Sequence, residues 1–434
     1  MSAGVVRAVR SLIVRAEFDS GMPEIGELVI VDNSERSPLL VESIINENTV
    51  LCLNIRGSYA IQKGMAINLT GKGIEIPVGD ATIGRVLDAL GQVIDGKPPI
   101  TGTQTRNILR PPRRIADFKV SSPEILETGI KVIDFFAPFV KGRKVGIVGG
   151  AGVGKTVLTM ELINNVSISK TGLAFFTGIG ERIREGHELY RTLSDRDLLK
   201  NTCLFFGQMN ENPVLRSLVG LASTTLAEYF RDEGKRDILF FVDNMYRFVQ
   251  SRNELATILD YVPSEGGYQP TIFSDVKTLQ DRLSSSENGS ITSVQTIYVP
   301  ADDLSDPAVQ TIQRELDSVV VLSRKVAEQG IRPAVDLLKT SSSLLSKEIV
   351  GERHYNLSVA AQKLVQQYES LRTIIAIIGE NELSPADRAD FARAKELIQF
   401  FAQATHVTEH LDGKKGEYFT REQTLDGVEK IVSR

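Results

Sequence analysis

The segment that most constrains this chain is a glycine-rich loop between an apolar run and a helical pattern. Residues 144–148 are apolar after the first position and predict a buried strand, whereas residues 157–166 have the periodicity of an amphipathic helix. The residues between them follow the pattern G-x-x-x-x-G-K-[ST]: Gly149, Gly150, Ala151, Gly152, Val153, Gly154, Lys155 and Thr156. A strand, such a loop and a helix in this order predict an α/β domain.

This loop has the chemistry of a triphosphate cradle. Its glycines let successive backbone N–H groups turn toward phosphate, and the following helix N-terminus adds partial positive charge. Lys155 can reach the outer phosphates, and the Thr156 hydroxyl can bind Mg²⁺. We therefore expect the loop and the next residue, Val157, to bind a nucleoside triphosphate. A coincidental glycine-rich turn is the alternative, which the flanking strand and helix disfavour.

Two further segments place charge at the ends of predicted strands. Residues 238–242 are an apolar strand ending in Asp243, and in P-loop proteins such a carboxylate holds Mg²⁺. Residues 172–176 predict another strand, which leads to Glu181, Arg182 and Glu185. Open α/β sheets bind ligands at the carboxyl ends of their strands, so a carboxylate here could orient a water molecule and an arginine could neutralise developing charge. A solvated charged turn explains the second group equally well.

The pattern of apolar residues predicts a multidomain α/β chain with three parts. Residues 1–72 contain short alternating runs separated by turns, typical of a small β-barrel or sandwich. Residues 73–345 alternate apolar strands with helical stretches, which favours a P-loop domain with a mostly parallel sheet and helices on both faces. Residues 346–434 lack strand signals, so we expect a C-terminal helical domain.

Net charge and cysteine content indicate which partners and which cellular compartment to expect. The net charge of −5 gives no general reason to expect nucleic-acid binding. Cys52 and Cys203 lie in apolar, strand-like contexts and are expected to be buried thiols, which suits a reducing compartment. No signal peptide is recognisable, and no apolar run reaches the roughly 18 residues of a membrane span.

Longer motifs resemble the catalytic β subunit of F-type ATP synthases over nearly the whole chain. They lie at residues 77–86, 124–134, 149–158, 267–271 and 290–307. The resemblance implies the same three-part architecture, with a RecA-like P-loop domain at its centre. It also implies ATP, ADP and phosphate as substrates, with Mg²⁺ as the cofactor.

The resemblance assigns roles to matching positions. Glu181 would polarise the attacking water, and Arg182 would bind the γ-phosphate beside Lys155. Glu185 and Asp243 would hold Mg²⁺ through its waters. Non-catalytic α subunits have a different phosphate loop and lack this glutamate, so the resemblance favours a catalytic chain.

The resemblance also implies partners. These are α-type subunits alternating with this chain in a ring, a central γ-type stalk, and through the stalk a membrane sector that translocates protons or sodium ions. The chain would then be peripheral on the cytoplasmic face of a bacterial membrane. An organelle-encoded equivalent fits as well, because Met1 leads directly into a predicted strand. No nucleic-acid partner is expected.

The departures from the family lie outside the phosphate loop. Tyr261 stands where the family has a phosphate-binding arginine, and three aromatic positions of the adenine pocket are Arg332, Thr405 and Leu411. An arginine plane can stack on a base, so Arg332 stays a nucleotide-binding candidate. The acidic motif of the helical domain, residues 381–387, has lost part of its charge. Two alternatives therefore stay open: an uncoupled rotary-type ATPase in secretion or motility, and a nucleotide-binding structural subunit without catalysis.

Overall fold

The chain divides into two compact units, each assembled from separate stretches of sequence. The structure is a computed structural model that describes residues 4–19, 21–111, 123–168, 172–264, 266–379, 383–409 and 413–433. The first unit comprises Met1–Lys119, Gly172–Ile291 and Pro307–Ile312. The second comprises Val120–Thr171, Thr292–Asp306 and Gln313–Arg434.

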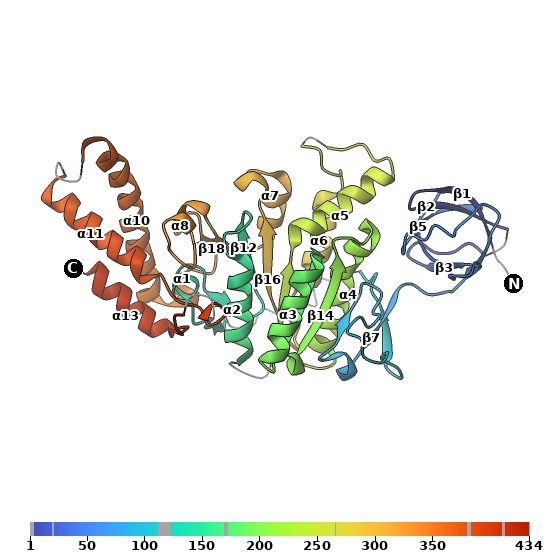
Figure 1. The fold of residues 1–434 in the computed structure, drawn as a ribbon, viewed down its shortest axis with the longest axis horizontal. Coiled ribbons are helices and arrows are strands. Elements are labelled where there is room, and N and C mark those ends of the chain that lie inside the picture. Colours follow the sequence, from blue (N-terminus) through green and yellow to red (C-terminus); the bar gives the residue numbers. More distant parts are fainter. Residues whose placement is uncertain are drawn as a thin grey trace. The chain divides into compact units, whose positions relative to one another are not determined.

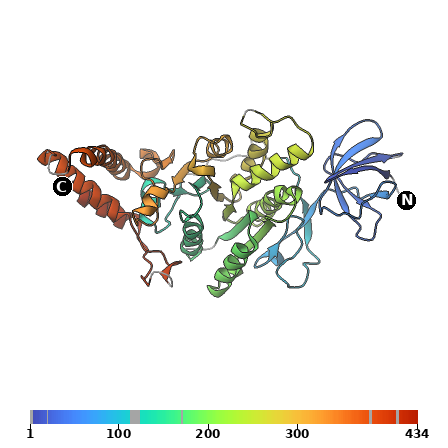
Figure 2. The same ribbon diagram turned by 45° about the horizontal axis from the view of Figure 1, so that its top comes forward.

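The first unit begins with a closed barrel, which confirms the prediction for the N-terminus (dark blue in Figures 1 and 2). Its strands are β1 (Gly4–Arg10), β2 (Ile13–Phe18), β3 (Leu28–Val31), β4 (Pro38–Ile44), β5 (Thr49–Asn54) and β6 (Ala66–Leu69), paired in the order β1-β2-β5-β4-β3-β6. Alternate side chains, among them Val6, Val14 and Val41, fill the barrel. Strands β1 and β2 form a hairpin that turns at Ser11, whose φ is 55°.

The rest of the first unit contains parallel strands in the order β15-β13-β14-β8. These are β15 (Ile238–Asp243), β13 (Leu173–Glu181), β14 (Thr202–Gln208) and β8 (Val86–Leu87). Every residue of β13 except Glu181 is buried, as expected for a strand covered on both faces. The covering helices include α3 (Ile183–Asp195), α4 (Pro213–Asp232), α5 (Met245–Ile258) and α6 (Ile272–Arg282). A small antiparallel pair, β7 (Glu75–Val78) and β9 (Gln104–Asn107), packs beside α4.

The second unit contains the sheet strands β18-β17-β12-β16, in this order, and a separate antiparallel pair, β10 (Ile125–Leu126) and β11 (Phe139–Val140). Strand β12 (Lys144–Gly149) lies parallel to β16 (Ile291–Tyr298) and to β17 (Ser318–Val321), whereas β18 (Ser341–Ser342) is antiparallel. Helix α2 (Lys155–Ile168) follows β12 after the glycine-rich loop. The mostly parallel sheet with its helices thus agrees with the predicted fold class.

The C-terminal part is helical, as predicted (orange to red in Figure 1). Its long helices are α10 (Glu352–Ile378), α11 (Pro385–Phe400) and α13 (Arg421–Val432), which pack on one another and on the short α1 (Lys131–Phe136). Ser384 caps α11, and Thr420 with Gln423 forms a capping box at the start of α13. No helix among the described residues is long and apolar enough to cross a membrane.

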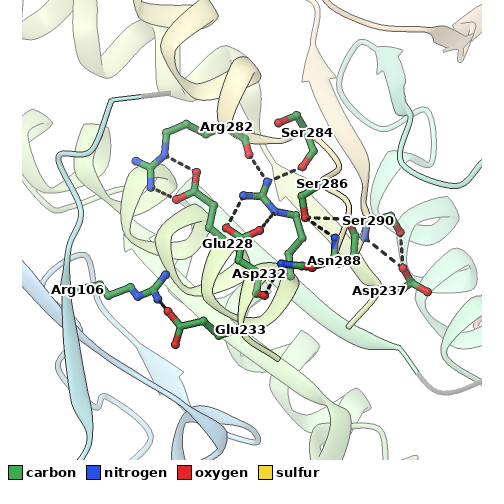
Figure 3. Close-up of polar contacts among 12 residues, drawn as sticks. Arg106, Glu228, Asp232, Glu233, Asp237, Arg282, Ser284, Ser286, Asn288 and Ser290 are labelled. Carbon is green, nitrogen blue, oxygen red and sulfur yellow. Dashed lines mark hydrogen bonds and ion pairs between the residues drawn. The ribbon is translucent and has the colours of Figure 1, made fainter. Parts of the chain in front are cut away.

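A buried ionic network joins α4 to the end of α6 in the first unit (Figure 3). The Arg282 guanidinium donates to both oxygens of Glu228, from Nε at 3.1 Å and from Nη2 at 2.8 Å. It also donates to the Ile108 carbonyl at 2.8 Å and to the Thr225 hydroxyl at 2.7 Å. Because both charged side chains are almost fully buried, each depends on the other to balance its charge.

Both cysteines are buried, as predicted. Burial raises the pKa of the Cys52 and Cys203 thiols to about 12, so both stay protonated and unreactive at neutral pH.

Candidate nucleotide site

The phosphate loop of the second unit has the predicted strand–loop–helix geometry. Strand β12 ends at Gly149, and α2 begins at Lys155. Gly152 and Gly154 have φ values of 73° and 98°, in a region of backbone conformation that residues other than glycine rarely adopt. No atom lies within 4 Å of the position of a Cβ at either residue, so backbone conformation and not crowding explains the glycines there.

The Lys155 ammonium lies over the loop that precedes it. Its Nζ donates to the Gly149 carbonyl at 2.7 Å and also to the Gly150 carbonyl. It lies 5.6 Å from the centroid of the Tyr298 ring, at the end of β16. The lysine is half-buried, and Thr156 beside it is exposed. The structure therefore fixes a cation at the N-terminus of α2, where an anion is also favoured by the helix dipole.

Two residues that were not predicted as part of the nucleotide site also touch this loop. Arg324 donates from Nη2 to the Ala151 carbonyl at 3.0 Å, and from Nε to Asp302 at 3.0 Å. Asp302 in turn packs against Gly150. Neither residue lies in a recognisable motif for phosphate binding, and only the fold brings these segments to the loop.

The acidic residues predicted for catalysis come together in the first unit. Strand β13 extends beyond the predicted 172–176 and ends at Glu181, and its register with β14 shifts between Ile179 and Glu181. Gly180 at this irregularity has a φ of 66°. Such a bulge redirects the next side chain. Asp243 ends the neighbouring strand β15, where it is paired with Gly178 of β13.

The electrostatics of Glu181 show how closely these carboxylates approach. Burial raises the pKa of Glu181 well above its usual range, and the charge of Asp243 and a hydrogen bond with Glu185 raise it further. Arg247, in the first turn of α5, opposes this rise in the pKa. Arg247 was not among the residues predicted from the sequence, although its place four residues after Asp243 in a new helix was a usable signal.

This donor set fits a magnesium ion better than a metal that needs a complete protein cage. Among the described residues, no three His, Cys, Asp or Glu side chains form a ready-made metal site. Mg²⁺ usually keeps several waters and takes one or two carboxylates together with substrate phosphates. The crowding of Glu181, Glu185 and Asp243 is of the kind that a divalent cation relieves.

Arg182 lies at the start of α3, next to Glu181 in sequence. It occupies the N-cap position of the helix, and its carbonyl accepts the Gly186 amide at 3.1 Å. The residue is exposed. It also lines a cavity of about 280 Å³ together with Glu181, His187 and Tyr190. The arginine is therefore available to an anionic ligand that reaches this edge of the first unit.

The predicted base-binding positions are only partly described. Arg332 is exposed, and its Nη1 donates to the carbonyls of Ala327 at 2.9 Å and Ile331 at 3.0 Å. Its own carbonyl accepts the Gln403 amide at 2.8 Å, which joins this segment to the one carrying Thr405. Leu411 lies outside the described residues.

The other two departures from the family are Tyr261 and the acidic motif at residues 381–387, and the structure describes the motif only in part. Tyr261, in the first unit, is half-exposed just after α5. In the acidic motif at 381–387, the first two residues lie outside the described ranges, and Asp387 forms part of the N-terminal cap of α11 through Ser384.

Fold and site together define a P-loop nucleotide-binding protein with an N-terminal barrel and a C-terminal helical region. Comparison with protein families specifies the class further. Residues 129–342 match the nucleotide-binding domain of the ATP synthase alpha/beta family, and residues 344–413 match the C-terminal domain of V and A type ATP synthase. The chain is therefore a member of the rotary ATP synthase alpha/beta family, with ATPase or ATP synthase chemistry as its kind of activity.

Proposed function

We propose that this chain is the catalytic subunit of a rotary ATP synthase, making or hydrolysing ATP. The observation that carries the proposal is Glu181, a half-buried and largely desolvated carboxylate at the end of β13 beside Asp243 and Glu185. A purely structural nucleotide-binding subunit has no need of a desolvated carboxylate there. Burying such a group costs stability, so its retention supports catalysis.

The chain's own residues divide the work between binding and chemistry. The loop from Gly149 to Thr156 binds the phosphates through its amides, and Lys155 neutralises the outer ones. Glu181 orients the attacking water in hydrolysis, and Arg182 stabilises charge on the transferred phosphoryl group.

Magnesium belongs to this proposal as the cofactor. Glu185 and Asp243 would hold it through water, and Thr156 would supply a hydroxyl. When bound, the ion neutralises phosphate charge and aligns the terminal phosphates.

The proposed partners follow from the family. We propose that α-type subunits alternate with this chain in a ring and supply an arginine to the site, with a γ-type stalk at the centre. Coupling to proton or sodium transport would place the chain on the cytoplasmic face of a bacterial membrane. Motifs in the first three quarters of the chain favour an F-type β subunit, whereas the match of residues 344–413 favours the V and A branch.

A Glu181→Gln substitution in the co-purified complex tests the catalytic role. Loss of a general base typically lowers kcat by about 10²- to 10⁴-fold, and we expect a fall in this range with Mg-ATP binding retained. Glu188→Gln is the matched control, because Glu188 is an exposed residue of α3 that pairs only loosely with Arg184, at 3.8 Å. The control should keep wild-type turnover.

One result would favour the second candidate, a nucleotide-binding subunit without catalysis. Tyr261 is the observation behind it, since it removes a cation that the resembling family uses. If Glu181→Gln turned over ATP as fast as wild type, Glu181 would not be catalytic. Sensitivity of the complex to an inhibitor of the ion channel would separate a coupled synthase from an uncoupled ATPase.

A further inference from the structure

Three successive carbonyls of the phosphate loop are each bonded to a cation. Lys155 Nζ donates to the carbonyls of Gly149 and Gly150. Arg324 Nη2 donates to the next carbonyl, that of Ala151, at 3.0 Å. The lysine belongs to the motif, whereas the arginine comes from α8 (Arg324–Glu328), far along the chain.

The third carbonyl belongs to the peptide between Ala151 and Gly152, where no neighbouring side chain crowds the glycine. A trans peptide is planar, so its carbonyl and the following N–H point in opposite directions. Holding the Ala151 carbonyl on one side therefore directs the Gly152 amide to the other. Gly152 has a φ of 73° and no atom within 4 Å of a Cβ position, so sterics alone do not hold this peptide. The hydrogen bond from Arg324 Nη2 holds the carbonyl of this peptide.

Arg324 is itself held in place by Asp302. Its Nε donates to Asp302 Oδ2 at 3.0 Å. The carboxylate is seated against the loop so closely that a Cβ on Gly150 would lie 1.8 Å from Asp302 Oδ1. Ala301 and Asp302 adopt φ values of 52° and 56°, an unfavourable conformation for two consecutive residues that are not glycine. A strained turn thus delivers a carboxylate to an anion-binding loop.

A carboxylate beside a phosphate site repels the ligand, so its presence calls for another role. We infer that Arg324 is a positioning residue for phosphate binding, which fixes the Ala151–Gly152 peptide with its N–H toward the ligand, and that Asp302 orients Arg324. Neither side chain needs to touch the nucleotide. The inference rests on the proposed function only in taking this loop as the phosphate site.

Binding of Mg-ATP and of Mg-tripolyphosphate to the full chain, measured by calorimetry, tests this inference. Arg324→Ala should weaken both ligands by about threefold to tenfold, the loss expected for one hydrogen bond. An equal loss of affinity for tripolyphosphate would show that Arg324 acts on phosphate binding, since that ligand has no base or ribose. Arg324→Lys should retain part of the affinity.

Asp302→Asn separates positioning from simple charge. If Arg324 acted only through its positive charge, removing the Asp302 carboxylate would tighten phosphate binding, and Lys325→Ala would weaken it as much as Arg324→Ala does. Positioning predicts instead that Asp302→Asn weakens binding and that Lys325→Ala, a matched loss of charge at the next residue of α8, leaves it near wild type. Thermal unfolding of each variant checks that the chain is folded. If Arg324→Ala does not fold, Asp302→Asn still tests the inference.

The outcomes distinguish this inference from the proposed function. Wild-type binding that is unchanged by Arg324→Ala, or tightened by Asp302→Asn, overturns the positioning role and leaves the proposed function standing. If the wild-type chain binds neither ligand, the proposed phosphate site fails, and this inference fails with it.

Discussion

Replacing Arg282 by methionine should be among the most destabilising single changes in the first unit. The substitution keeps the apolar stem and removes the guanidinium, which lies almost fully buried at 1% exposure against Glu228 at 9%. Glu228 then loses both of its hydrogen bonds from Arg282, and the Ile108 carbonyl and the Thr225 hydroxyl each lose a donor. Figure 3 shows the geometry of this pair.

The expected cost follows from the burial of the charge left behind. Breaking a buried ion pair by removing one partner typically costs about 3–5 kcal/mol of the free energy of unfolding, because the remaining charge has no partner. The double variant Arg282→Met, Glu228→Gln removes that charge and should recover part of the loss. This recovery would show that the penalty comes from the isolated carboxylate more than from lost packing.

Urea denaturation of the full chain, followed by circular dichroism and fluorescence, measures this difference where the two transitions coincide. Lys277→Met is the matched control on the same helix, since Lys277 pairs with Asp281 at 3.0 Å while half-exposed. Exposed pairs contribute about 0–1 kcal/mol. If Arg282→Met cost no more than Lys277→Met, the reasoning about the buried pair would be refuted.

Three smaller predictions concern a histidine, a helix cap and a glycine. Burial lowers the pKa of His354 from its unfolded value of 6.5, so the stability that the neutral ring contributes is complete above pH 6.5 and is lost as the pH falls below 6.5. His354→Gln should therefore flatten the fall of Tm between pH 7 and pH 5. Asn212→Ala removes the cap of α4 and the donor to the Ile55 carbonyl at 2.7 Å, and should lower the unfolding free energy by about 1–2 kcal/mol in urea titrations, whereas Asn212→Asp should keep the cap. Gly129→Ala should lower Tm by several degrees, because a Cβ there would lie 2.1 Å from Tyr418 and the φ is 73°, and an unchanged Tm would show that the ring moves aside freely.

Local patterns predicted the elements of this fold well. The short alternating runs in residues 1–72 predicted the barrel strands, and the lack of strand signals after residue 346 predicted the helical region that contains α10. These signals work because the apolar face of a strand or helix is written in adjacent residues. The phosphate loop was equally clear, since its chemistry depends on one continuous segment.

The details of the catalytic edge were not predictable in the same way. The sequence suggested a strand ending near Phe176, but β13 continues to Glu181 because β14 and β15 pair with it along its length. The irregularity at Gly180 arises from this pairing. Arg247 acts on Glu181 from α5, and its sequence position alone does not show which strand end it faces.

The sequence by itself therefore determined the barrel, the helical C-terminal region and the phosphate loop, each from residues that are neighbours in the chain. Only the tertiary structure decided that Glu181 meets Asp243, and that Arg324 reaches the Ala151 carbonyl from 173 positions away. The physical reason is that a hydrogen bond or a charge acts through space over a few ångströms, and folding chooses which distant residues come within that range.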